Sequence, residues 1–223
     1  MPDGQYSFYL HSDDRTDIAA MATISTISQP LRGEFIRTAA TAGAVVYQVD
    51  ARLPALIPVF FAGQLSAVRL CAVMALVSGA WSSLTGLPDE PENGEAALPV
   101  SPETEYQRRR YTLTLQNGRS GERVESVLTE ASSRLRGDLL RNLIITGLAL
   151  HTTAPELPRL LASMPVPPTS VSELQALVQQ MAGTADVNRA AAAVPDTPTA
   201  SAAPVSGPDT REIKKNMRRA FGD

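Results

Sequence analysis

Two short segments of the chain alternate apolar and polar side chains with a period of two, which is typical of a strand with one buried face. In the first segment the apolar and then the polar positions are Tyr6, Phe8 and Leu10, then Ser7, Tyr9 and His11. In the second they are Tyr111, Leu113 and Leu115, then Thr112, Thr114 and Gln116. The sequence therefore predicts two short strands that lie far apart in the chain.

Each predicted strand is followed by apolar positions that recur every three or four residues, the spacing of a helix with one buried face. In the two copies these positions are Ile18, Met21, Ile24 and Ile27, and Val124, Val127, Leu128 and Ala131. A second helix is predicted to begin near Gly33 in one copy and Gly137 in the other. A further helical layer follows Leu53-Pro54 and Leu157-Pro158.

The two strand-helix segments belong to an internal duplication. Residues 31–79 recur without a gap at residues 135–183, so the offset is 135 − 31 = 104. The offset carries Gly43 onto Gly147, inside the second predicted helix of each copy. Glycine costs about 1 kcal/mol relative to alanine in a helix. Its presence in both copies therefore indicates a close helix–helix approach, or a relic of the duplication.

A lone strand followed by helices leaves its backbone N–H and C=O groups unpaired, and a second copy supplies the missing partner. The predicted fold class is mainly α with a two-stranded antiparallel ribbon. It is a tandem ribbon-helix-helix pseudo-dimer with extra C-terminal helices in each repeat. The sequence leaves open whether the two strands pair within one chain or between two chains.

Composition divides the 223-residue chain into five parts. The first repeat with its helical extension is placed at residues 4–83 and the second at 108–183, with an acidic linker at 84–107 between them. Residues 184–208 are rich in Ala, Pro, Thr and Ser and are predicted to be a disordered linker. Residues 209–223 form a predicted amphipathic helix.

The composition favours a cytoplasmic binding protein over an enzyme. The chain has one cysteine and two histidines, so we expect no disulfide, no metal site and no catalytic residues. No phosphate-binding or dinucleotide-binding loop is present, so no cofactor is expected. The apolar run from Ala67 to Trp81 is interrupted by Arg69 and is too short to span a bilayer, so no membrane association is expected.

The polar face of a two-stranded ribbon has the right width to enter the major groove of DNA. The candidate DNA-binding residues are Ser7, Tyr9, His11, Arg32, Gly33, Arg108, Arg109, Arg110, Thr112, Thr114, Gln116, Arg136 and Gly137. The strand residues Ser7, Tyr9, His11, Thr112, Thr114 and Gln116 would face the groove and read bases. Arg108–Arg110 would precede the second strand and contact phosphate, unless they only solvate its entrance. Gly33 and Gly137 would open helices whose free N–H groups bind phosphate, with Arg32 and Arg136 beside them.

The C-terminal residues 209–223 have the pattern of a short partner-binding helix. Ile213, Met217 and Phe221 recur every four residues, and Lys214 and Arg218 lie between them. Such a segment on a disordered tether suits docking into the groove of an acidic partner. The alternatives are a basic tail that touches DNA phosphate without specificity and, less favoured, a segment that binds a membrane surface.

The segment 6–10, followed by 33–37 and 49–56, resembles the ParR/StbB class of plasmid partition adaptors. The resemblance implies binding to double-stranded, centromere-like DNA repeats and attachment to an actin-like ParM-type ATPase filament through a flexible C-terminal segment. The tandem duplication departs from this class, whose members carry one unit per chain and dimerise. Any self-association on DNA is therefore left open.

Two other functions stay open at this point. One is a tandem ribbon-helix-helix transcriptional repressor or conjugation accessory protein without a filament partner. The other is a helical protein-interaction module that never touches DNA. If the ribbon does read DNA, its two polar strand faces differ in sequence, so we expect a non-palindromic site.

Overall fold

The computed structural model describes residues 4–80 and 107–192 of the chain. Almost all of the predicted acidic linker and all of the predicted C-terminal helix at 209–223 lie outside these residues. Met1–Arg189 form one compact unit that contains both repeats. Mainly helical, with one two-stranded antiparallel sheet, this unit confirms the predicted tandem ribbon-helix-helix fold class.

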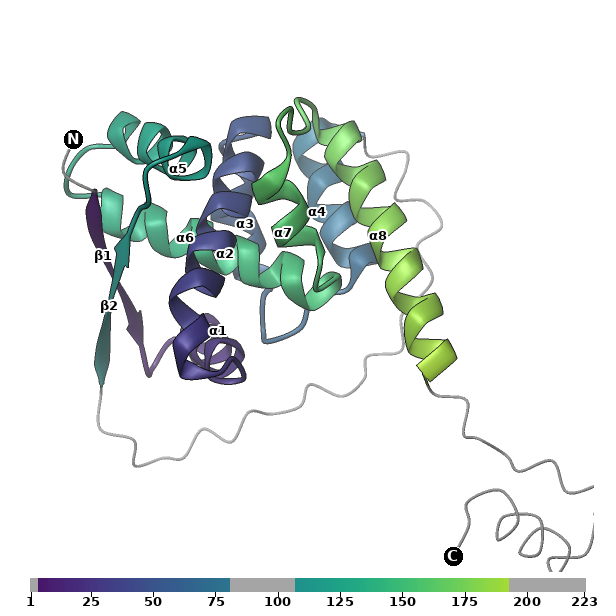
Figure 1. Cartoon of the computed structure of the whole chain (residues 1–223). Coiled ribbons are helices and arrows are strands. Elements are labelled where there is room, and N and C mark those ends of the chain that lie inside the picture. The colour runs from purple at the N-terminus through teal and green to yellow at the C-terminus, as the bar shows by residue number, and fades with distance from the viewer. Residues whose placement is uncertain (1–3, 81–106, 193–223) are drawn as a thin grey trace, which may run out of the picture. The chain divides into compact units, whose positions relative to one another are not determined.

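The two repeats have the same order of elements. The first comprises β1 (Gln5–His11), α1 (Arg15–Ser25), α2 (Gln29–Val49), α3 (Leu53–Phe60) and α4 (Ala67–Ser78). The second comprises β2 (Arg108–Thr114), α5 (Arg119–Glu130), α6 (Arg136–Thr153), α7 (Leu157–Ser163) and α8 (Val171–Ala192). The ribbon lies at one edge of the unit, with α4 and α8 at the opposite edge (Figure 1). The helices between them cover one face of the ribbon.

The two strands pair with each other within one chain. Gln5 lies opposite Thr114, Ser7 lies opposite Thr112, and His11 lies opposite Arg108. Tyr6 corresponds to Tyr111 in the duplication, an offset of 111 − 6 = 105, and the same offset carries Ser7 onto Thr112. Two equivalent residues therefore face each other, so the ribbon has a pseudo-twofold axis at this pair. The structure answers the open question in favour of a covalent pseudo-dimer.

The apolar strand positions seal the hydrophobic core, as the alternation predicted. Phe8, Leu10, Leu113 and Leu115 are buried, and Phe8 stacks on Tyr111 with 5.2 Å between ring centroids. The residues that complete this core include Ile36, Val45, Val46, Leu140, Leu143, Ile144 and Leu148. Each strand thus presents one face to the helices, and its other face points away from the core.

The central helices α2 and α6 cross where the two duplicated glycines lie. A Cβ atom added to Gly43 would collide with the backbone of Leu143, and one added to Gly147 would collide with the backbone of Ala39. At the offset of 104, Ala39 corresponds to Leu143, so the two contacts are equivalent by pseudo-symmetry. The predicted close helix approach is confirmed, and glycine is required because backbone meets backbone.

Capping residues set several helix boundaries. The Asp14 carboxylate accepts from the N–H of Asp17 at 3.0 Å and begins α1, while Ser66 begins α4 in the same way. Gly79 adopts a left-handed conformation, φ 76°, and ends α4. Helix α8 continues to Ala192, past the boundary predicted at 183. Residues 184–192 are therefore helical and not part of a linker, which agrees with their high alanine content.

Candidate nucleic-acid interface

Every outward position of the ribbon is polar. In strand order these residues are Gln5, Ser7, Tyr9 and His11 on β1, and Arg108, Arg110, Thr112 and Thr114 on β2. They lie opposite one another in pairs, because residues that pair across an antiparallel ribbon share a face. Two cations and no carboxylate are present among them. A face of this kind suits a polyanion with hydrogen-bonding edges.

Two arginines hold diagonal contacts across this outward face. The Nε and Nη2 groups of Arg110 donate to the Ser7 hydroxyl oxygen at 3.2 and 3.0 Å. The Arg108 guanidinium lies over the Tyr9 ring, 3.6 Å from its centroid. Cation–π and hydrogen-bonding contacts keep both arginine side chains along the ribbon surface. Their remaining N–H groups stay exposed and can donate to a ligand.

The prediction that Arg108–Arg110 precede the second strand is wrong. β2 begins at Arg108, so all three arginines are strand residues. Arg108 and Arg110 share the outward face with Thr112 and Thr114, whereas Arg109 points to the inner side at the end of the ribbon. There it lies 5.4 Å from the Tyr111 ring centroid. The three consecutive charges hide the alternation of the strand, because Arg109 occupies an inner position, opposite buried Leu10, and its side chain is nevertheless exposed.

Gln116 does not lie on the ribbon. β2 ends at Thr114, and the N–H of Leu115 makes a last backbone hydrogen bond to the Gly4 carbonyl at 3.0 Å. Gln116 follows in the loop before α5, where it is exposed. The sequence prediction therefore extended the second strand two residues too far, to Gln116. Conversely, it missed Gln5, whose position opposite Thr114 places it on the outward face.

The two glycines predicted at helix starts differ in their positions. As predicted, Gly137 lies in the first turn of α6. The structure also places it close to the Ser7 carbonyl of β1. Gly33 is wrong as a helix start, because α2 begins one turn earlier at Gln29, with Ser28 as N-cap and Pro30 in the first turn. A proline is favoured in the first turn of a helix, so Pro30 was the sequence signal for this earlier start of α2. The free N–H groups of α2 therefore precede Gly33.

Arg32 and Arg136 bind backbone oxygens at the end of the preceding helix. The Nε of Arg32 donates to the Ile27 carbonyl at 2.8 Å, and that of Arg136 donates to the Ala131 carbonyl at 3.2 Å. Ile27 and Ala131 are equivalent at the offset of 104. The shared contact fixes the turn between the two helices of each repeat. Any phosphate contact by these arginines would use their other guanidinium nitrogens.

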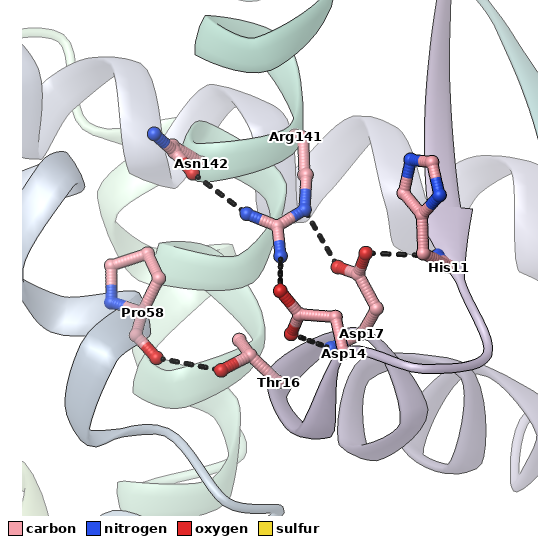
Figure 2. A network of polar contacts seen from close by, with 7 residues as sticks. All are labelled: His11, Asp14, Thr16, Asp17, Pro58, Arg141 and Asn142. Carbon is pink, nitrogen blue, oxygen red and sulfur yellow. Dashed lines mark hydrogen bonds and ion pairs between the residues drawn. The ribbon is translucent and has the colours of Figure 1, made fainter.

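A polar network joins the two repeats beside the ribbon (Figure 2). The Arg141 guanidinium of α6 binds the Asp17 carboxylate of α1 at 2.6 Å and the Asp14 carboxylate at 3.1 Å. Asp17 also accepts from the backbone N–H of His11 at 2.9 Å. Burial raises the pKa of Asp17, and the hydrogen bond from Arg141 opposes this shift without cancelling it. The network locks the end of β1 to a helix of the other repeat.

The described residues contain no group of three His, Cys, Asp or Glu side chains that could hold a metal ion. Cys71 is buried, and burial raises the pKa of its thiol. In the part of the chain that the structure describes, every helix falls short of the length and apolar character needed to cross a bilayer.

The fold and its polar ribbon face define a tandem ribbon-helix-helix protein. The family model described as "Plasmid stability protein" matches the chain twice, at residues 4–74 and 109–178. The chain therefore belongs to the plasmid stability protein family and carries its unit in two copies. No curated protein and no solved structure gives a significant match to the chain.

Proposed function

We propose that this chain is a DNA-binding adaptor of a plasmid partition system. Its ribbon binds centromere-like DNA repeats, and its C-terminal segment couples them to an actin-like, ParM-type filament. The proposal assigns binding and not catalysis to the chain. Membership of the plasmid stability family supports the biological setting. The observation that carries the DNA-binding part is the wholly polar outward face of the ribbon, which has two arginines and no carboxylate.

The chemistry of this face matches the edges of base pairs. An arginine fork can donate to the O6 and N7 atoms of guanine, and a threonine methyl can contact the thymine methyl. Arg108, Arg110, Thr112 and Thr114 lie on one strand of the face and are exposed. The family gives the place of such a protein in plasmid maintenance. The ribbon gives the means by which it would recognise the plasmid.

The pseudo-symmetry of the ribbon implies a DNA-contacting surface whose two halves carry different side chains. At the offset of 105, Tyr9 corresponds to Thr114 and Gln5 corresponds to Arg110. The backbone is thus nearly twofold while the base-contacting side chains are not. A single chain would prefer a non-palindromic site and bind it in one orientation, which suits directional arrays of repeats.

The DNA-binding part is tested by fluorescence anisotropy with duplexes from the region that flanks the gene, at stated salt because phosphate contacts dominate the salt dependence. The combined variant Arg108→Gln and Arg110→Gln should weaken binding by about tenfold to a hundredfold. Arg69→Gln, on α4 at the opposite edge of the unit, is the control that removes one positive charge away from the ribbon. Equal binding by wild type and double variant would refute the ribbon as the contact surface. No DNA binding at all would favour the protein-interaction module.

The filament part of the proposal rests on the sequence of residues 209–223, which lie outside the described residues. Their deletion should leave DNA affinity unchanged and abolish co-sedimentation with filaments of an actin-like ATPase from the same plasmid. Unchanged capture would refute the role of the tail. The absence of any such partner gene, with DNA binding intact, would favour the repressor or conjugation accessory protein.

A further inference from the structure

The two ends of the ribbon each adjoin a hollow, and the two hollows are equivalent by the internal duplication. One, of about 500 Å³, is lined by residues that include Asp14, Asp17, Asp138 and Arg141. The other, of about 350 Å³, is lined by residues that include Glu34, Arg37, Gly118 and Gly121. At the offset of 104, Arg37 corresponds to Arg141 and Glu34 to Asp138. The two hollows therefore occupy the same place in the two repeats and carry different side chains.

The contacts of the two N-terminal helix ends show that this correspondence also holds for α1 and α5. The Thr16 hydroxyl donates to the Pro58 carbonyl at 3.1 Å, and the Ser120 hydroxyl donates to the Ala162 carbonyl at 3.2 Å. Both pairs are related by 104 residues. The N-caps of these helices, Asp14 and Gly118, are related in the same way.

Two carboxylates of the first hollow are therefore replaced by glycines in the second. Arg141 binds Asp14 and Asp17, which come from the facing helix. The facing positions for Arg37 are Gly118 and Gly121, and Arg37 binds Glu34 of its own helix at 2.7 Å. The first hollow carries four aspartates and two arginines, whereas the second carries one glutamate and three arginines. The acceptors that neutralise the first arginine site are absent from its counterpart.

We propose that the hollow lined by Arg37, Arg119 and Arg159 is a phosphate-binding site. The three arginines come from three different helices, α2, α5 and α7, and line the same hollow. Arg119 and Arg159 have no carboxylate partner among the described residues, and Arg37 has one. Guanidinium forks match the oxygens of a phosphate group, and the first-turn N–H groups of α5 add further donors. The bound phosphate takes the place of the Asp14 carboxylate, beside Gly118, whereas the Gln116 carbonyl lies where the side chain of an Asp17 equivalent would begin.

The phosphate group has two sources, the DNA backbone beside the ribbon or a free phosphorylated molecule. A DNA backbone phosphate as the ligand rests on the proposed function, whereas the phosphate-binding site itself does not. The first experiment therefore contains no DNA. Full-length protein is titrated with inorganic phosphate and then pyrophosphate at constant ionic strength, and the amide resonances of residues 118–121 are followed by nuclear magnetic resonance.

We expect saturable shifts at these amides with pyrophosphate. The combined variant Arg119→Gln and Arg159→Gln should raise the Kd at least about tenfold, because charged hydrogen bonds are lost. Arg15→Gln, a single charge loss at the residue of α1 that corresponds to Arg119, is the control and should leave the Kd unchanged. Absence of saturable shifts, or equal shifts in the double variant whose fold is verified by circular dichroism, overturns the proposal.

A second titration identifies the source of the phosphate. If the DNA backbone occupies the site, pyrophosphate competes with DNA, and the double variant lowers the slope of log affinity against log salt by about two. If the ligand is a free phosphate, the double variant loses pyrophosphate binding and keeps its DNA affinity. Failure to bind DNA would refute the proposed function and leave the pyrophosphate result interpretable.

Discussion

The first and second repeats share a backbone and differ in how they fasten the ends of the ribbon. Beside β1, a buried carboxylate and a second carboxylate hold Arg141 of the other repeat. Beside the end of β2, glycines stand at both equivalent positions, and Arg37 turns to a carboxylate on its own helix. One end is neutralised from within the protein and the other keeps positive charge for a ligand. Duplication within one chain permits this difference between the ends, because either repeat can change in sequence independently of the other.

The comparison predicts its largest effect on stability at Asp17. Asp17→Ala removes a buried acceptor, 1% exposed, for Arg141 Nε and for the N–H of His11. Breaking a buried ion pair by removing one partner costs about 3–5 kcal/mol. Urea unfolding followed by circular dichroism measures the change.

Glu34→Ala is the matched control at the other end of the ribbon. The Glu34 side chain is 64% exposed, and exposed ion pairs contribute less than about 1 kcal/mol. A loss of stability in Glu34→Ala as large as that in Asp17→Ala would mean that the two ends are fastened alike.

The next effect concerns a feature that the two repeats share. Gly43→Ala forces a Cβ atom into the backbone of Leu143 at the crossing of α2 and α6. Overpacking of this kind costs about 1–3 kcal/mol. Gly33→Ala, in the same helix with only ordinary contact to Arg37, should stabilise the protein by up to about 1 kcal/mol through helix propensity. Thermal unfolding of both variants distinguishes the two outcomes, and a neutral Gly43→Ala would contradict the close crossing.

The smallest effect is a pH dependence confined to the first repeat. Burial raises the pKa of Asp17 above its ordinary value of 3.8, so the folded state holds this proton more tightly than the unfolded state. The contribution of Asp17 to stability is complete below pH 3.8 and declines as the pH rises through the raised pKa. The difference in unfolding free energy between wild type and Asp17→Ala should therefore shrink from pH 3.8 towards neutrality. A difference that grows with pH would show that the Arg141 attraction outweighs burial.

Local patterns predicted the parts of the structure that depend on one segment. The alternation around Phe8 and Leu113 gave the buried faces of the strands, and Gly43 with Gly147 indicated the helix crossing. The start of α2 was predicted near Gly33 and lies at Gln29, because a proline is tolerated in the first turn of a helix. The strand character of Arg108–Arg110 was missed because solvent, and not core, faces Arg109.

Other features depend on contacts between the two repeats and carry little local signal. Asp17 looks like an ordinary first-turn acidic residue, and its burial follows from Arg141, which is far away in the chain. The hollow with three arginines draws on three helices, so no spacing in the sequence reveals it. The available signal was the alignment of the repeats, in which Asp14 and Asp17 fall on Gly118 and Gly121. A difference between two otherwise equivalent units marks a position where function can diverge.

If one chain presents a single DNA-reading ribbon with unlike ends, it holds every bound site in one orientation, and tethered DNA cleavage measures that orientation. A cleaving iron chelate is attached to Asp13→Cys or to Asn117→Cys, exposed positions at opposite ends of the ribbon, in a Cys71→Ala background. We predict that each probe cuts one flank of every bound site and that the two probes cut opposite flanks. Equal cutting of both flanks by either probe would show binding in two orientations. Bound DNA without any cutting would show that the ribbon is not the contact surface, and either result would contradict the claim.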